Sequence, residues 1–164
     1  MKNELPSAKN SALLVLNNAI SSNTNIAINA FSNQAFEISP YTSDASKTKS
    51  AINSIQSSGA TALYDAIKLA GDSAVAHKTD GIKSIVILYT DGQDRGSVHS
   101  KQNAIDAISK AKASQIDSVF LIFVGDDVDA KNDLESLANL AGRQFLQVSS
   151  SSELEAAIKS ALGQ

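Results

Sequence analysis

The sequence has no cysteine, no excess of basic residues and no long apolar run. The lack of cysteine excludes disulfides, thiolate metal sites and cysteine nucleophiles. No apolar stretch approaches the roughly 20 residues that cross a bilayer, and the first residues lack the apolar segment of a signal peptide. With 14 Lys and Arg against 17 Asp and Glu, the formal net charge is −3. We therefore expect neither nucleic-acid binding nor membrane insertion.

The composition is that of a folded domain. Hydrophobic residues make up 43% of the 164 residues, a fraction too high for a disordered chain. This length suffices for one buried core. Residues 1–164 are therefore expected to form a single domain.

Apolar periodicity divides the chain into helices and strands. Recurrence at three- and four-residue spacing predicts helices at residues 3–21, 44–56, 62–77, 100–114, 130–141 and 151–162. Alternating or continuous apolar runs predict strands at residues 25–32, 35–39, 84–89, 119–124 and 144–148. Within the first helix, Leu13–Leu16 taken alone is also compatible with a short buried strand.

The strands predict a mostly parallel sheet with one antiparallel hairpin at its edge. Residues 84–89 and 119–124 are almost continuously apolar, which is typical of parallel strands covered on both faces. Strands 25–32 and 35–39 are joined by a short connection, so they should pair antiparallel. Pro40 either ends the second of them or marks it as an edge strand. The predicted fold class is α/β, doubly wound, with right-handed crossovers.

Polar residues follow the predicted parallel strands at their carboxyl ends, where open α/β sheets bind ligands. Asp91 comes directly after strand 84–89. Its carboxylate could bind a hard cation or act as a base or nucleophile, but Asp-Gly is also a common turn pair. Asp126-Asp127 indicates a turn and a helix start. His77 and His99 are expected at the surface, and the chain has neither a phosphate-binding glycine loop nor a hydrolase motif.

Four segments of the chain form an ordered pattern with a characteristic spacing. They are Ile28–Ser32, Gly59–Ile67, Ile85–Gly92, and Phe123–Val128 followed by Leu137-Ala138 and Gly142. Together they resemble the von Willebrand factor type A (VWA) domain family over nearly the whole chain. The resemblance implies a Rossmann-like sheet with a metal-ion-dependent adhesion site (MIDAS). In that family three loops hold Mg²⁺ or a similar cation, and a partner's carboxylate completes the coordination. Thr61 and Asp91 match two of these loops.

The third loop of such a site, Asp-x-Ser-x-Ser after a first central strand, has no counterpart in the sequence. Asp44-x-Ser46-x-Thr48 has the spacing, but it stands at a helix start, where Asp44 is expected to be the cap. The residues from Met1 onward resemble those that follow the missing motif. The resemblance therefore implies a chain that lacks the first strand, through truncation, an internal start or a wrongly assigned start.

A missing strand would leave open edges on strands 25–32 and 84–89, between which it would lie. The neighbouring strands would close up, another chain would supply a strand, or an exchanged dimer would form; of these we favour completion by another chain. Thr61 and Asp91 alone offer one hydroxyl and one carboxylate. We therefore expect Mg²⁺ or another divalent cation to bind weakly or not at all.

The resemblance implies a protein-binding, adhesion-type module rather than an enzyme, with a partner that presents a carboxylate. Asp94 and Arg95 lie in the loop above Thr61 and Asp91, where they either shape partner choice or belong to a solvated loop. Two alternatives stay open. Asp91 could be the phosphoacceptor of a receiver-like domain or a catalytic carboxylate. A receiver needs a lysine at the end of a later strand, but strand 119–124 is followed by Gly125. The chain could also be a non-functional fragment of a larger VWA protein.

Overall fold

The computed structural model describes residues 5–20, 25–56, 59–80, 85–116, 118–124, 127–140 and 144–148, together with Glu153, Ala156 and Lys159. The elements are α1 (Leu5–Ile20), β1 (Ile26–Phe31), β2 (Ala35–Thr42), α2 (Ala45–Ser54), α3 (Leu63–Ala76), β3 (Ile85–Thr90), α4 (Lys101–Ala113), β4 (Ser118–Val124), α5 (Val128–Leu140) and β5 (Gln144–Val148). Each agrees in type with a predicted element. Leu13–Leu16 is helical within α1, so the strand alternative is wrong. Most of the predicted helix 151–162, including its proposed serine cap, lies outside the described residues.

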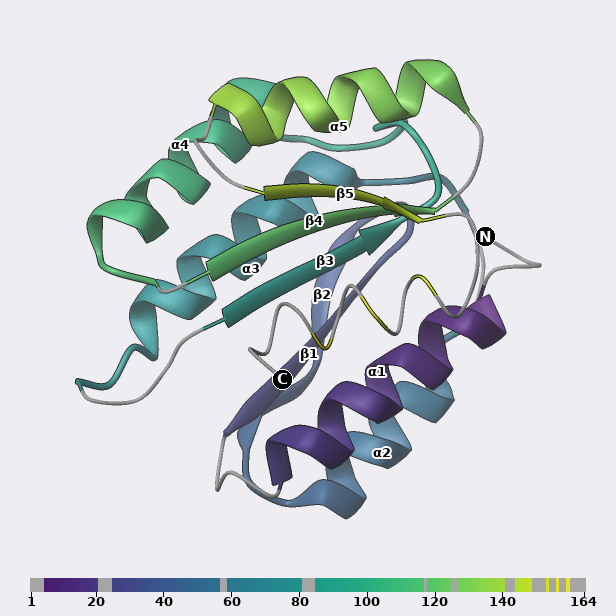
Figure 1. Cartoon of the computed structure of the whole chain (residues 1–164), viewed down its shortest axis with the longest axis vertical. Coiled ribbons are helices and arrows are strands. Elements are labelled where there is room, and N and C mark those ends of the chain that lie inside the picture. The colour runs from purple at the N-terminus through teal and green to yellow at the C-terminus, as the bar shows by residue number, and fades with distance from the viewer. Residues whose placement is uncertain are drawn as a thin grey trace.

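The strands form two sheets within the described residues. β3, β4 and β5 pair in parallel in that order, with Ile85 opposite Ser118. β1 and β2 form an antiparallel hairpin, with Phe31 opposite Ala35. Figure 1 shows the three parallel strands side by side, and within the described residues the β1–β2 hairpin is a separate sheet. The α/β class with mostly parallel strands and an antiparallel hairpin is thereby confirmed, and within the described residues β1 does not pair with β3.

Helix α3 joins the two sheets. It contacts β1 and β2 as well as β3, and it packs closely on α4. Leu63 and Ile67 of α3 are buried in one apolar cluster with Leu121 and Phe123 of β4 and Leu134 of α5. Each such side chain stabilises the fold by roughly 1.5–3 kcal/mol. Figure 1 shows α1 and α2 side by side, away from α4 and α5. The core thus fixes the strand ends from which the loops of the candidate site emerge.

Strand β2 continues through Pro40 to Thr42, beyond its predicted end at residue 39. Because proline has no N–H, a strand accepts it only at an edge or at a bulge. Both conditions are met, since β1 is the partner of β2 within the described residues and the pairing shifts between Ile26 and Ile28. Of the two alternatives for Pro40, the edge strand is the correct one.

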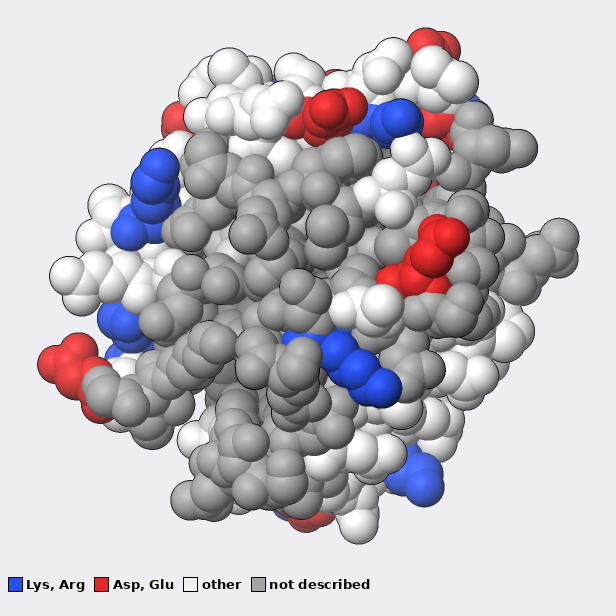
Figure 2. All heavy atoms as spheres, viewed as in Figure 1, with Lys and Arg blue, Asp and Glu red and all other residues white. Residues whose placement is uncertain are grey.

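The described surface has mixed charge. On the face drawn in Figure 2, the described Lys and Arg side chains are interspersed with Asp and Glu rather than gathered in one patch. The described part of this face therefore offers no continuous basic field to a phosphate backbone. None of the helices that the structure describes is long and apolar enough to span a membrane.

Candidate functional site

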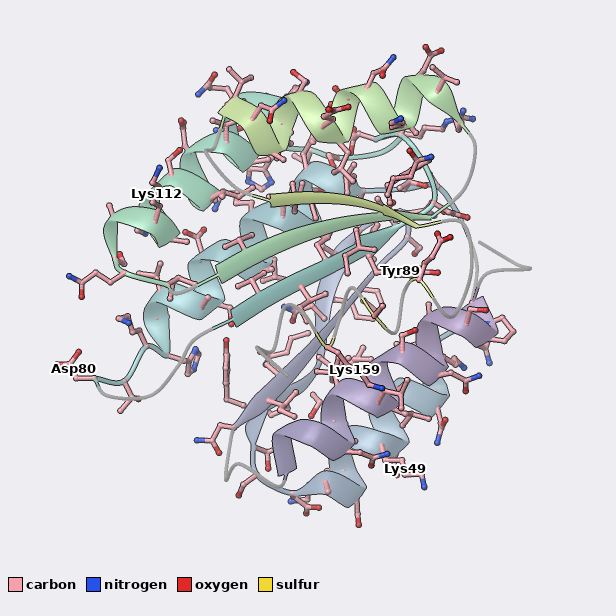
Figure 3. The ribbon with its side chains drawn as sticks, in the orientation of Figure 1. Lys49, Asp80, Tyr89, Lys112 and Lys159 are labelled. Atoms are coloured by element: carbon pink, nitrogen blue, oxygen red, sulfur yellow. The ribbon has the colours of Figure 1, made fainter. Side chains whose placement is uncertain are left out.

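Three loops meet at the carboxyl edge of the parallel strands: residues 32–34, 59–62 and 91–100. Ala62 N donates to Ser32 O at 2.7 Å, and Ala60 N donates to Asn33 Oδ1 at 2.6 Å. Arg95 N donates to Thr61 O at 2.8 Å. Figure 3 shows Tyr89 near this end of β3, with Asp80 and Lys112 at the opposite edge of the sheet. The middle loop is therefore bonded to both of the others.

The structure brings Thr61 and the Asp91-Gly92 turn together. A Cβ atom built on Gly92 would lie 3.9 Å from Thr61 Oγ1. The turn itself is shaped by buried Thr90, whose Oγ1 accepts from Gly92 N at 3.3 Å. Asp91 is half-buried at the exit of β3. The hydroxyl of Thr61 thus faces the residue that follows Asp91.

Asp94 caps helix α3 from outside the helix. Ala62, at the N-cap position, makes no side-chain capping bond. Asp94 Oδ1 accepts instead from Tyr64 N at 3.2 Å and from the Ser97 hydroxyl. A carboxylate is favourable at this end of a helix because unpaired N–H groups and the positive end of the dipole lie there. Arg95, the other residue predicted to contact a partner, is exposed.

Asp65, in the first turn of α3, holds the far end of the 91–100 loop. Its carboxylate accepts from Val98 N at 3.0 Å and His99 N at 2.9 Å, and His99 Nδ1 lies 2.7 Å from it. Burial acts to raise the pKa of Asp65, but the hydrogen bonds from His99 and Val98 outweigh burial and leave the pKa lowered. Sequence reasoning placed His99 at the surface, which is correct, but missed its carboxylate partner. The two residues are 34 positions apart, and no local sequence pattern links residues at that separation.

A second carboxylate, Asp133 of α5, joins three helices beneath this loop. The Tyr64 hydroxyl donates to Asp133 Oδ2 at 2.8 Å, and Lys101 Nζ donates to Asp133 Oδ1 at 2.7 Å. Burial, followed by the hydrogen bond to Asp133, raises the pKa of Tyr64. Tyr64 lies in the first turn of α3 and Lys101 is the first residue of α4, so this network fixes the starts of both helices beside the 91–100 loop.

Two acidic residues stand at helix starts that the sequence predicted, and Asp44 is the cap expected there. Asp44 Oδ1 accepts from Ser46 N at 3.0 Å and Lys47 N at 3.1 Å at the start of α2. Asp127 Oδ1 accepts from Ala130 N at 2.9 Å at the start of α5, whereas Asp126 lies outside the described residues. Asp44-x-Ser46-x-Thr48 is therefore a helix start, as the sequence predicted.

The family model for the von Willebrand factor type A domain matches residues 1–160. The chain belongs to the VWA domain family. No curated protein matches the sequence. The family assignment agrees with the parallel pairing of β3, β4 and β5.

Solved structures share this fold at low sequence identity. BatB, a conserved hypothetical protein from Bacteroides thetaiotaomicron, is 21% identical, with 97% of this chain and 86% of that chain covered and a TM-score of 0.74. Proximal thread matrix protein 1 from the mussel byssus, with a zinc-occupied MIDAS motif, is 20% identical, with coverages of 99% and 43% and a TM-score of 0.71. The vWF domain of the type V pili tip protein Mfa5 from Porphyromonas gingivalis is 13% identical, with coverages of 95% and 86% and a TM-score of 0.75.

In this VWA domain, the two residues predicted as cation ligands are compared with what such an ion needs. Thr61 and Asp91 offer a hydroxyl and a carboxylate, and oxygen donors of this kind suit Mg²⁺. Asp94, the next acidic residue, is already engaged in capping α3. The described residues contain no group of three or more His, Asp or Glu that could hold a metal ion. The donors have the right chemistry, but two of them do not fill an octahedral shell.

Proposed function

We propose that this VWA domain is a protein-binding module that acts by binding rather than catalysis, and that its partner binds at the edge formed by the 32–34, 59–62 and 91–100 loops. The observation that carries the proposal is the placement of Thr61 Oγ1 beside Gly92, directly after Asp91. Family membership supports a role in protein interaction or adhesion. In mussel PTMP1, zinc occupies a MIDAS motif, which supports a divalent cation at the equivalent edge.

Each residue of the proposed site has a distinct task. The Asp91 carboxylate supplies negative charge to a divalent cation, Mg²⁺ or a similar ion, and the Thr61 hydroxyl supplies a neutral oxygen. A bound cation would offer open positions to a carboxylate of the partner protein. The hydrogen bond from Arg95 N to Thr61 O keeps the two loops together without a ligand. Because the site has only these two proposed donors, we propose that the cation binds weakly to this chain.

Cation titration followed by NMR tests this proposal. We expect Mg²⁺ to shift the amide signals of residues 59–62 and 91–94 with a dissociation constant of roughly millimolar, because one carboxylate and one hydroxyl neutralise the ion poorly. Asp91→Asn and Thr61→Ala should abolish the shifts. Asp80→Asn, at the opposite edge of the sheet in Figure 3, should leave them unchanged. Micromolar affinity would refute the weak site, and shifts elsewhere would refute its location.

We also propose that another chain completes the sheet, in a homo-oligomer or strand-exchanged dimer. The support is the division of the described strands into β1–β2 and β3–β4–β5, which leaves β1 and β3 with one neighbour each among the described residues. Strand edges with free N–H and C=O groups attract further strands.

A further inference from the structure

The loop of residues 94–99, the 94–99 loop below, is held in one conformation by contacts with α3 and the 59–62 loop. Arg95 N bonds to Thr61 O at 2.8 Å, and Val98 N bonds to Asp65 Oδ2 at 3.0 Å. A Cβ atom on Gly96 would lie 3.4 Å from the Cβ atom of Ala60, so the backbone here runs close to the neighbouring loop. A loop that is already ordered loses little conformational entropy when a partner binds.

Two side chains of this fixed loop extend into solvent. Val98 is 87% exposed, more than any other large apolar side chain that the structure describes. Its backbone N–H is bonded, so its exposure does not come from a frayed segment. Arg95 is exposed as well, and its guanidinium makes no ion pair with a described residue. The loop thus offers one apolar group and one cation to solvent.

The backbone of both residues is held close to the proposed cation site. Arg95 is bonded to Thr61 itself. Val98 N is bonded to the carboxylate of Asp65, which lies in the first turn of α3, the helix that directly follows the 59–62 loop. A protein segment whose carboxylate binds at Thr61 and Asp91 would therefore also reach the 94–99 loop.

We propose that Val98 and Arg95 select the partner, which is a protein segment that places an apolar side chain against Val98 and a second carboxylate against Arg95. The inference rests on the proposed function, because the first carboxylate of the segment binds at Thr61 and Asp91. The exposed Arg95 favours an acidic group on the partner by charge complementarity. Val98, which is 87% exposed, offers an apolar contact that a nucleic-acid backbone does not match.

Peptide selection on the full 164-residue chain tests this inference. A library of random linear peptides is selected in the presence of Mg²⁺, and the enriched peptides are synthesised with a fluorophore and titrated by fluorescence polarisation. We expect enriched peptides to combine acidic and apolar residues. Val98→Ser and Arg95→Ala should each weaken binding about tenfold or more. Circular dichroism confirms that each variant is folded.

The matched control is Leu140→Ser. Leu140 is 65% exposed at the end of α5, just before β5 begins, and so lies near the amino-terminal edge of the sheet. Its substitution should leave binding unchanged. Peptides that need Asp91 but bind Val98→Ser and Arg95→Ala normally would overturn the inference and leave the proposed function standing. Peptides that need Val98 and Arg95 but tolerate Asp91→Asn would refute the cation site and the proposed function, while the selection of the partner by Val98 and Arg95 would stand. Failure to enrich any Val98-dependent peptide would overturn it.

Discussion

Gly59 shows how one residue sets the geometry of the site loops. Its φ is +73°, in the left-handed region that glycine adopts without strain. A Cβ atom at this position would lie 2.4 Å from Asn33 Oδ1, the oxygen that accepts from Ala60 N. The side chain of Asn33 could move aside only by breaking that bond. Glycine at position 59 therefore lets the 32–34 and 59–62 loops approach each other.

Gly59→Ala should lower the free energy of unfolding by about 1–3 kcal/mol. Alanine is strained in the left-handed backbone conformation, and its Cβ atom would break the hydrogen bond from Ala60 N to Asn33 Oδ1. Urea unfolding followed by circular dichroism measures the loss. Gly96→Ala is the control, since its Cβ atom would make an ordinary contact at 3.4 Å and its φ is outside the left-handed region. That variant should change stability by less than about 0.5 kcal/mol. Equal losses in the two variants would contradict the interpretation.

At the scale of elements, the start of α3 depends on groups from a distant loop. Asp94 and Ser97 accept from the N–H groups of Tyr64 and Asp65, and Asp65 in turn accepts from the loop. The helix lacks a capping side chain at Ala62, so the loop supplies the bonds that the local sequence does not. Helix and loop therefore stabilise each other.

Asp65→Asn should destabilise the fold by about 1–3 kcal/mol at pH 7, because a neutral amide replaces a carboxylate that accepts three hydrogen bonds. The pKa of Asp65 is lowered in the folded state, so its contribution is complete above the unfolded pKa of about 3.9. It is lost as the pH falls through the folded pKa. The stability difference between wild type and variant should therefore persist from pH 7 to pH 5 and shrink towards pH 3.

Urea unfolding at a series of pH values measures this difference. Asp80→Asn removes an exposed carboxylate at the opposite edge of the sheet, and its stability should follow that of the wild type throughout. A difference for Asp65→Asn that grows as the pH falls would have the wrong sign and would refute the role assigned to this carboxylate.

The same elements show what the sequence could predict. Periodicity located the helices and strands because each buries one apolar face or run, and Asp44 was recognisable as a cap because its bonds are local. The sequence does not decide whether β2 continues through Pro40, because that depends on which side of the strand has a partner. The Asp65–His99 and Tyr64–Asp133 contacts join residues 34 and 69 positions apart. They depend on tertiary packing and leave no pattern in the sequence.

At the scale of the whole molecule, topology explains why the position of Thr61 beside the Asp91 turn could be anticipated. Parallel strands end at one edge of the sheet, so residues that follow them or precede the adjoining helix come together whatever their separation in sequence. The roles of Asp94 and Arg95 could not be separated in this way. Asp94 turns inward to cap α3 and Arg95 turns outward, and that choice depends on the path of the loop.

The division of the strands into two sheets makes the oligomeric state the decisive property of the whole molecule. α3 holds β1–β2 and β3–β4–β5 in one fold, while β1 and β3 each have one strand neighbour among the described residues. If a second copy completes the sheet, light scattering after size exclusion should give twice the chain mass of 17.1 kDa. Copies carrying different tags should exchange only after unfolding and refolding together, because exchange requires strands to leave a sheet. A monomer that unfolds in one cooperative step would exclude the exchanged dimer.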